Sequence, residues 1–104
     1  MIEFIETRAF TAASEILMGE DELFDLQVYL AERPEAGVVV RGTGGIRKLR
    51  WRGLGRGKRG GLRVIYYWAV RANQIWLLAL YGKNARDDVP AHVLRKWREE
   101  ISDD

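Results

Sequence analysis

Residues 62–81, LRVIYYWAVRANQIWLLALY, contain the two segments that decide the fold. Residues 62–70 are β-branched and aromatic almost throughout, which is the composition typical of a β-strand. Residues 74–81 are almost wholly apolar, as expected of a central strand that is covered on both faces. Residues 71–73 are predicted to form a short turn, so the two strands should pair antiparallel. The centre of the chain is therefore predicted to be a small sheet.

A third strand is predicted just upstream, over residues 46–52, IRKLRWR. Strand alternation places its side chains in two sets, Arg47, Leu49 and Trp51 on one face and Lys48, Arg50 and Arg52 on the other. Residues 38–40 are β-branched and are predicted to be an edge strand or the start of a strand. The glycines at positions 42, 44 and 45 interrupt the pattern between these segments.

The N-terminal third is predicted to be a short strand followed by a helical hairpin. Residues 2–6 alternate as in a strand, and Thr7 is placed to cap a helix over residues 8–18. Gly19 ends that helix, and a second helix is expected from residue 20 until Pro34 stops it. The apolar stripes of both helices are expected to pack on the sheet.

The C-terminal segment is predicted to be one more helix. Asp87 or Asp88 is expected to cap it, with Pro90 in its first turn. Its apolar stripe consists of Val93, Leu94, Trp97 and Ile101. The predicted fold is a single α+β domain over residues 1–104, with a small, mostly antiparallel sheet and the order β-α-α-β-β-β-α.

The formal net charge of +2 conceals three blocks of different sign. Residues 1–35 carry a charge of −7, residues 36–86 carry +12 and residues 87–104 carry −3. No Asp or Glu occurs between Glu35 and Asp87. Such a density of like charge repels itself, and a folded chain bears that cost where a polyanion is the partner. The central block is therefore predicted to face RNA.

Composition also excludes several classes of site. The chain has no cysteine, so disulfides and thiolate metal sites are excluded. No apolar run approaches the roughly 18 residues of a membrane span, and acids stand where a signal peptide has a basic head. No cluster of metal ligands is evident, so neither a metal nor a cofactor is expected. We expect a cytoplasmic protein with no membrane partner.

Residues 53–61 form a glycine-rich connection that contains the pattern G-x-G-x-x-G at Gly55, Gly57 and Gly60. A dinucleotide site is excluded because a strand follows, where that motif requires a helix N-terminus. Glycine lets backbone N–H groups approach a phosphate, and cations neutralise it. The cations placed between these glycines, Arg56, Lys58 and Arg59, therefore predict anion binding.

Any RNA cleavage by this chain would depend on Lys, Arg and Tyr. His92 is the only histidine and is expected to be solvated or capping, so the usual pair of catalytic imidazoles is absent. The ribose 2′-OH serves as the nucleophile, and Arg can stabilise oxyanions but cannot act as a base. Neighbouring cations disfavour the charged form of Lys58 or Lys48, which makes either lysine a candidate for proton exchange. Tyr81 is a candidate for stacking on a base or for using its phenol, and Tyr67 shares a strand face with Arg63.

Three sequence blocks in this order resemble the HigB-like branch of the RelE/ParE superfamily, the toxins of type II toxin–antitoxin modules. They are GTGGIRKLR at 42–50, GRGKRGGLRVIYY at 55–67 and YGKNARDDV at 81–89. The resemblance implies a small sheet with helices packed on one side. It also implies a protein of bacterial or phage origin that acts as a ribosome-dependent endoribonuclease, cuts mRNA in the ribosomal A site and inhibits translation.

The resemblance also assigns roles to individual residues. Arg56 and Lys58 would contact the RNA backbone, and Arg63 would face the scissile phosphate. Tyr81 and Lys83 would close the site, while Lys48 and Arg50 would extend the phosphate-binding face. The sequence departs from the family at Arg59, where a small residue is more usual, and at Gly82, where Ser is common.

The same resemblance implies partners: a cognate helix-turn-helix antitoxin, the ribosome with its mRNA, and operator DNA reached through the antitoxin complex. Two alternatives stay open at this stage. One is a ParE-like toxin that binds DNA gyrase and cuts no RNA, since a shared fold does not decide function. The other is a non-catalytic RNA-binding module, because basic and aromatic residues suffice for binding.

Overall fold

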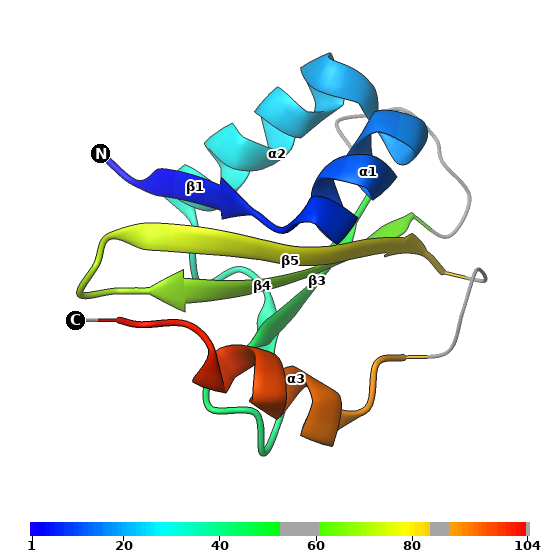
Figure 1. Cartoon of the computed structure of the whole chain (residues 1–104). Helices are drawn as coiled ribbons and strands as arrows, with labels where there is room; N and C mark the ends of the chain where they lie inside the picture. The colour runs from blue at the N-terminus through cyan, green and yellow to red at the C-terminus, as the bar shows by residue number, and fades with distance from the viewer. Residues whose placement is uncertain (53–60, 84–87, 104) are drawn as a thin grey trace.

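A five-stranded sheet runs through the centre of the molecule, with helices on both of its faces (Figure 1). The structure, a computed structural model, describes residues 1–52, 61–83 and 88–103. The elements in the described part of the chain are β1 (Glu3–Glu6), α1 (Arg8–Leu17), α2 (Gly19–Glu32), β2 (Val38–Val39), β3 (Arg47–Trp51), β4 (Leu62–Ala69), β5 (Gln74–Gly82) and α3 (Ala91–Glu99). The predicted α+β class and the predicted segments are confirmed, and the short strand β2 adds one element to the predicted order.

The strands lie in the order β1-β5-β4-β3-β2. From β2 to β5 each strand pairs antiparallel with the next, which is the expected result of short links between successive strands. β1 forms one edge of the sheet and pairs parallel with β5, so β5 lies in the interior of the sheet. The nearly continuous apolar sequence of β5 reflects this central position, since both of its faces are covered.

One irregularity between β4 and β5 changes which side chains share a face. Ile65 pairs with Ala79, but the next residue, Tyr66, pairs with Leu77, so Leu78 is an extra residue on β5. A bulge of this kind resets strand alternation. Residues beyond it, Tyr81 included, consequently point to the face opposite to the one that uninterrupted alternation would give them.

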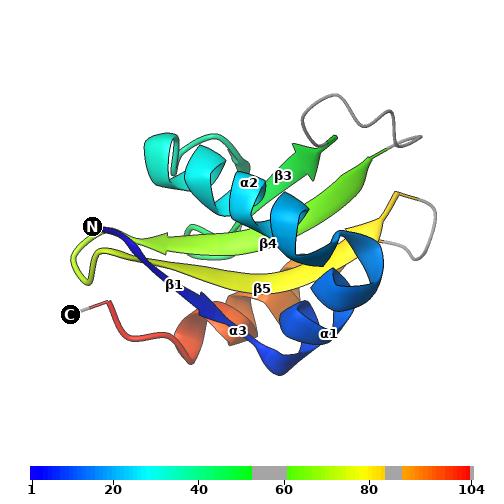
Figure 2. The ribbon, with the colours of Figure 1, turned by 90° about the horizontal axis from the view of Figure 1, so that it is seen from above.

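The first face of the sheet is covered by the α1–α2 hairpin (Figure 2). Phe10, Leu26 and Leu30 are fully buried there against the apolar side chains of β3, β4 and β5. Trp51 lies in the same cluster, and its indole donates a hydrogen bond of 3.1 Å to the buried carboxylate of Glu22. The prediction that the apolar stripes of both helices pack on the sheet is therefore confirmed.

α3 covers the opposite face, so the expectation that all helices pack on one side is wrong. A second core cluster joins Leu94 and Ile101 to Ile65, Tyr67 and Tyr81 of the sheet. The physical reason is that β4 and β5 carry apolar side chains on both faces. The helical hairpin buries only one of these faces, and the amphipathic α3 buries the other.

The two predicted N-terminal caps have different outcomes. Thr7 does cap α1, because its hydroxyl accepts a 3.0 Å hydrogen bond from the backbone N–H of Phe10. In α3 the capping position is Pro90, which makes no side-chain capping bond. Asp88 is therefore not a cap and has another role, whereas Asp87 lies outside the described residues. No helix in the described ranges has the length and apolarity needed to cross a membrane.

Candidate active site

A row of three polar side chains crosses the sheet near the ends of β3 and β5. Arg50 on β3 pairs with Arg63 on β4, and Arg63 pairs in turn with Tyr81 on β5. Directly paired residues share a face, and neighbouring strands are about 4.8 Å apart. We call Arg50, Arg63 and Tyr81 the Arg–Tyr row. It lies on the α3 face of the sheet, since Tyr81 belongs to the core cluster of that helix.

Lys48 stands one pair away from this row. It precedes Arg50 by two residues on β3, so strand alternation puts both side chains on the same face. Lys48 lines a pocket of about 200 Å³ together with Tyr81 and Asp88, and apolar side chains close the rest of its wall. The pocket and the row thus form one concave, cationic surface with a phenol in its wall.

Asp88 is the acidic member of this surface. Its Oδ2 lies 3.1 Å from the Nζ of Lys48, and its Oδ1 accepts a 3.4 Å hydrogen bond from the hydroxyl of Tyr81. The hydrogen bond from Lys48 and the lysine's charge hold the pKa of the Asp88 carboxyl below its usual value, with smaller contributions from Tyr81 and Arg63. The carboxylate therefore occupies the position in which these groups would hold another anion.

Sequence reasoning missed this role of Asp88. An acid two residues before a helix-starting proline is typical of a cap, and that local signal was misleading here. The sequence did contain one indication of this role. Asp87 and Asp88 are the first acids after the basic block of residues 36–86, and charge complementarity favours their pairing with cations of that block.

No protein-family model matches the chain. Among solved structures, a chain of the intact E. coli RelBE toxin–antitoxin complex superposes with a TM-score of 0.61 at 19% sequence identity. The match covers 83% of this chain and 100% of that chain. This chain has a RelE-like fold. The likeness extends over the whole length of the other chain, and it concerns the fold.

Within this RelE-like fold, the sequence-predicted site residues have different positions. The structure brings Lys48, Arg50, Arg63 and Tyr81 together on one face. Lys83 is exposed in the turn after β5. The predicted residues of the glycine-rich loop, Arg56, Lys58 and Arg59, lie outside the described residues.

Two further candidates are not part of this surface. His92 is exposed near the start of α3, in agreement with the expectation that it is solvated. Tyr67 does share a face with Arg63, but it is buried beneath α3, where the guanidinium carbon of Arg98 lies 4.3 Å from its ring centroid. Burial raises the pKa of Tyr67, and its hydroxyl donates to Asp103 at 3.4 Å. Tyr67, on β4, thus packs against α3.

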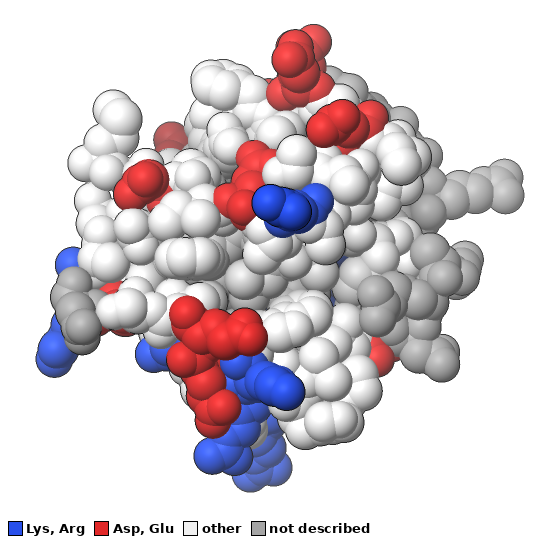
Figure 3. All heavy atoms as spheres, in the orientation of Figure 1, with Lys and Arg blue, Asp and Glu red and all other residues white. Residues whose placement is uncertain are grey.

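The electrostatics of the molecule vary from one region to another. Figure 3 shows Asp and Glu side chains over the α1–α2 hairpin and a mixture of acids and cations over α3. The described residues contain no group of three or more His, Cys, Asp and Glu side chains that could hold a metal ion. The Arg–Tyr row and the adjoining pocket together offer cations, a phenol and the carboxylate of Asp88, which suit anion binding and charge stabilisation.

Proposed function

We propose that this chain is the toxin of a type II toxin–antitoxin system and acts as a metal-independent endoribonuclease on mRNA at the ribosome. The observation that carries the proposal is the Arg–Tyr row, in which two arginines and a tyrosine are paired across neighbouring strands on the sheet face that holds the pocket of Lys48 and Tyr81. The likeness to a chain of the RelBE complex supports the toxin assignment. The three HigB-like sequence blocks support the choice of mRNA as substrate.

In the proposed reaction the 2′-oxygen of the RNA attacks the adjacent phosphorus and the bond to the 5′-oxygen breaks. The products are a 2′,3′-cyclic phosphate and a free 5′-hydroxyl, so the protein supplies no nucleophile. One proton leaves the 2′-hydroxyl and one reaches the departing 5′-oxygen. The protein must align these atoms, stabilise charge on the non-bridging oxygens and assist the two proton transfers.

The row suggests how these tasks are divided. In this proposal Arg63, at the centre of the row, binds the non-bridging oxygens, and Arg50 and Lys48 extend the cationic surface along β3. Tyr81 presents its hydroxyl at the wall of the pocket and is the candidate for contact with the 2′- or 5′-oxygen. Lys58 stays a proposed proton-exchanging residue, and Arg56, Arg59 and Lys83 stay proposed phosphate contacts.

The proposed partners follow from the charge distribution. A cognate helix-turn-helix antitoxin would neutralise the toxin by laying an acidic segment over the cationic face, and the pairing of Asp88 with Lys48 on that face supports this mode of binding. The complex would reach operator DNA through the antitoxin. The working location would be the bacterial cytoplasm, where the ribosome and mRNA are found.

The test is induced expression in bacterial cells followed by mapping of mRNA 5′ ends. Cuts within translated codons that disappear with Arg63→Ala, and persist with Arg71→Ala, support the nuclease and the site together. Arg71 is the matched control because it is an exposed arginine at the opposite end of the β4–β5 hairpin. Growth arrest with intact mRNA would instead indicate a gyrase-directed toxin. Ribosome or RNA binding without cuts would indicate a binding module.

A further inference from the structure

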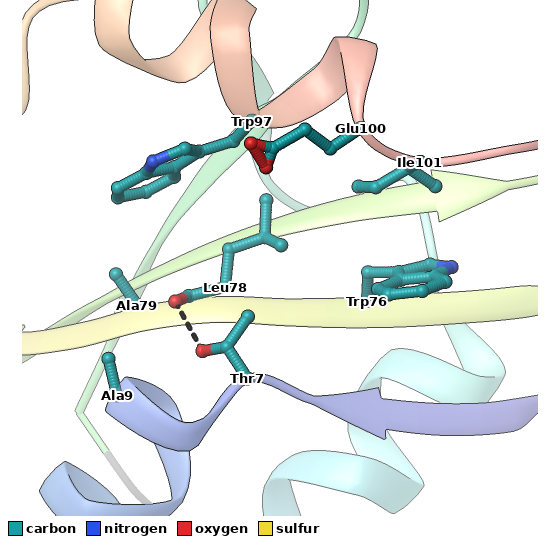
Figure 4. A pocket seen from close by; sticks show the side chains of 8 residues that line it. All are labelled: Thr7, Ala9, Trp76, Leu78, Ala79, Trp97, Glu100 and Ile101. Carbon is teal, nitrogen blue, oxygen red and sulfur yellow. Dashed lines mark hydrogen bonds between the residues drawn. The ribbon is translucent and has the colours of Figure 1, made fainter.

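A second hollow of about 400 Å³ lies between the start of α1, β5 and α3 (Figure 4). Its walls include the indoles of Trp76 and Trp97 and the side chains of Leu78 and Ile101. It opens on the same sheet face as the Arg–Tyr row but shares none of that row's residues, so what it binds does not depend on the proposed nuclease. A volume of this size is typical of a binding pocket.

The polar side-chain groups of Thr7 and Trp76 at this pocket are already engaged, whereas the indole N–H of Trp97 and the carboxylate of Glu100 make no hydrogen bond with a described residue. The hydroxyl of Thr7 donates to the carbonyl of Leu78 at 2.8 Å and accepts from Phe10. The indole N–H of Trp76 donates to Gln74 at 3.2 Å. The carboxylate of Glu100 makes no hydrogen bond or ion pair with any described residue. In the view of Figure 4, it lies beside the indole of Trp97 and above Leu78.

The chemistry of this lining selects a cation. An indole face attracts a cation through its quadrupole, and two indoles with one carboxylate combine that attraction with a charge partner. An uncharged apolar side chain would desolvate Glu100 without compensation. A nucleic acid would bring phosphates towards the same carboxylate, which like-charge repulsion disfavours. Arginine fits better than lysine because its planar guanidinium can stack on an indole while it bonds a carboxylate.

On the neighbouring strand β4, an aromatic ring, a cation and a carboxylate are already assembled within the chain. Tyr67 is the β4 partner of Trp76, and the guanidinium of Arg98 covers its ring at 4.3 Å. The hydroxyl of Tyr67 donates to the carboxylate of Asp103 at 3.4 Å. At the Trp pocket the rings and the carboxylate are present, but no described residue places a cation over either indole. A cation supplied by another molecule would complete the combination at this pocket.

We propose that the pocket between Trp76, Trp97 and Glu100 binds an arginine side chain presented by a partner protein. The guanidinium lies against an indole and pairs with Glu100, while its aliphatic stem packs on Leu78 and Ile101. The position of the pocket beside α3 means that such a partner contacts the chain at the edge of the face that carries the Arg–Tyr row. A partner docked there can cover the row without occupying it.

The proposal is tested by NMR on the ¹⁵N-labelled full chain, through the indole N–H signals of its four tryptophans. The probe is N-acetyl-arginine amide, and the matched control ligand is N-acetyl-citrulline amide, which has nearly the same shape without the charge. We expect the arginine probe to shift the Trp76 and Trp97 signals in a saturable way. It should bind roughly three- to tenfold more tightly than citrulline, the combined effect of one cation–π contact and one exposed ion pair. The Trp51 signal, in the opposite core, should not move.

Two variants separate the pocket from general charge effects. Glu100→Gln should reduce the preference for arginine over citrulline to near unity. Glu99→Gln, which neutralises the adjacent exposed acid of α3, should leave the preference intact. Equal binding of the two probes, no effect of Glu100→Gln, or no shift of either indole would overturn the proposal. A stronger shift with adenosine monophosphate would overturn it in favour of a base-binding pocket.

Discussion

Arg63 on β4 and Tyr81 on β5 are directly paired across the sheet, and both side chains lie on the face that α3 covers. The pairing depends on the bulge at Leu78, because uninterrupted alternation would turn Tyr81 towards the helical hairpin. Backbone pairing of two interior strands, near their ends, therefore holds an arginine beside a tyrosine. Sites built on strands in this way keep their geometry better than sites on loops.

Replacement of Arg63 by alanine should abolish most RNA cleavage and leave the fold intact. The side chain is half-buried at the centre of the Arg–Tyr row, where it would stabilise charge that develops on the phosphate. Loss of one such donor typically costs roughly 10²- to 10³-fold in rate. The measurement is the rate at which translated mRNA is cut, with Arg71→Ala as the control. Ribosome binding by Arg63→Ala should stay close to that of the wild type, and a parallel loss of binding would argue against a catalytic role.

Replacement of Tyr81 by phenylalanine tests the phenol alone. The ring is only 5% exposed and packs in the α3 core, so phenylalanine retains the packing and removes the hydroxyl. If the hydroxyl takes part in proton transfer, cleavage should fall by roughly 10²-fold or more. The thermal unfolding midpoint should change less than the cleavage rate, because phenylalanine keeps the packed ring and the hydrogen bond to Asp88 is long, at 3.4 Å, with a mostly exposed acceptor. Undiminished cleavage by Tyr81→Phe would limit Tyr81 to stacking or packing.

Replacement of Asp88 by asparagine should tighten anion binding. The carboxylate now pairs with Lys48 at 3.1 Å and neutralises part of the surface that a phosphate would use. Because the carboxylate is 69% exposed, the gain should be modest, roughly two- to fivefold in affinity for a non-cleavable 2′-deoxy oligonucleotide. Asp103→Asn is the matched control, since Asp103 also accepts a tyrosine hydroxyl at 3.4 Å, at the other end of the same sheet face. Weaker binding by Asp88→Asn would mean that Asp88 positions Lys48 and Tyr81.

The same ion pair has a defined pH dependence. Lys48 holds the pKa of Asp88 below its usual value, so the folded state binds this proton less readily than the unfolded state does. The contribution of the pair to stability is therefore present above the usual Asp pKa of about 3.9. It is lost as the pH falls through the lowered pKa of the folded state. An NMR titration should place the Asp88 midpoint below that of an ordinary aspartate, and Lys48→Ala should raise it.

The sequence predicts most of this fold because its signals are local. The β-branched and aromatic run of β4, the apolar run of β5 and the Thr7 cap each act within a few residues, and all three are confirmed. The parallel pairing of β1 with β5 cannot be predicted from local patterns, because the paired residues are about 70 positions apart in the sequence. The prediction that all helices lie on one side failed for a similar reason. Which face a helix covers depends on how much apolar surface the whole sheet presents.

The candidate site could be predicted only in part, because some of its residues are brought together by long-range pairing rather than by local patterns. Strand alternation correctly puts Lys48 and Arg50 on one face of β3. Alternation alone cannot place Tyr81, because a bulge reverses the face of every residue after it. The pairing of Asp88 with Lys48 joins residues 40 positions apart, and local patterns cannot separate it from a helix cap. The predicted roles of Lys58, Arg56 and Arg59 stay predictions.

Replacement of Thr7 should lower stability and disturb the site from a distance. Thr7 has four hydrogen bonds at the junction of β1, α1 and β5; two of them use its side chain, and its carbonyl accepts one from the N–H of Thr11 at 3.0 Å. Its hydroxyl donates to the carbonyl of the bulge residue Leu78 at 2.8 Å and accepts from the N–H of Phe10 at 3.0 Å. Its own N–H donates to the carbonyl of Leu77 at 3.1 Å. Thr7→Ala removes the cap and the bond to the bulge, at a cost of about 1–3 kcal/mol in the free energy of unfolding.

The effect on activity follows from the same contacts. The bulge fixes the face on which Tyr81 lies, so Thr7→Ala should slow RNA cleavage at a temperature where the variant is still fully folded. Thr7→Ser keeps the hydroxyl and should restore both stability and cleavage. Chemical denaturation measures the first effect and mRNA cutting the second. If Thr7→Ala loses stability but cuts RNA at the wild-type rate, the pairing of β4 with β5 holds the bulge without help from Thr7, and the junction serves the fold alone.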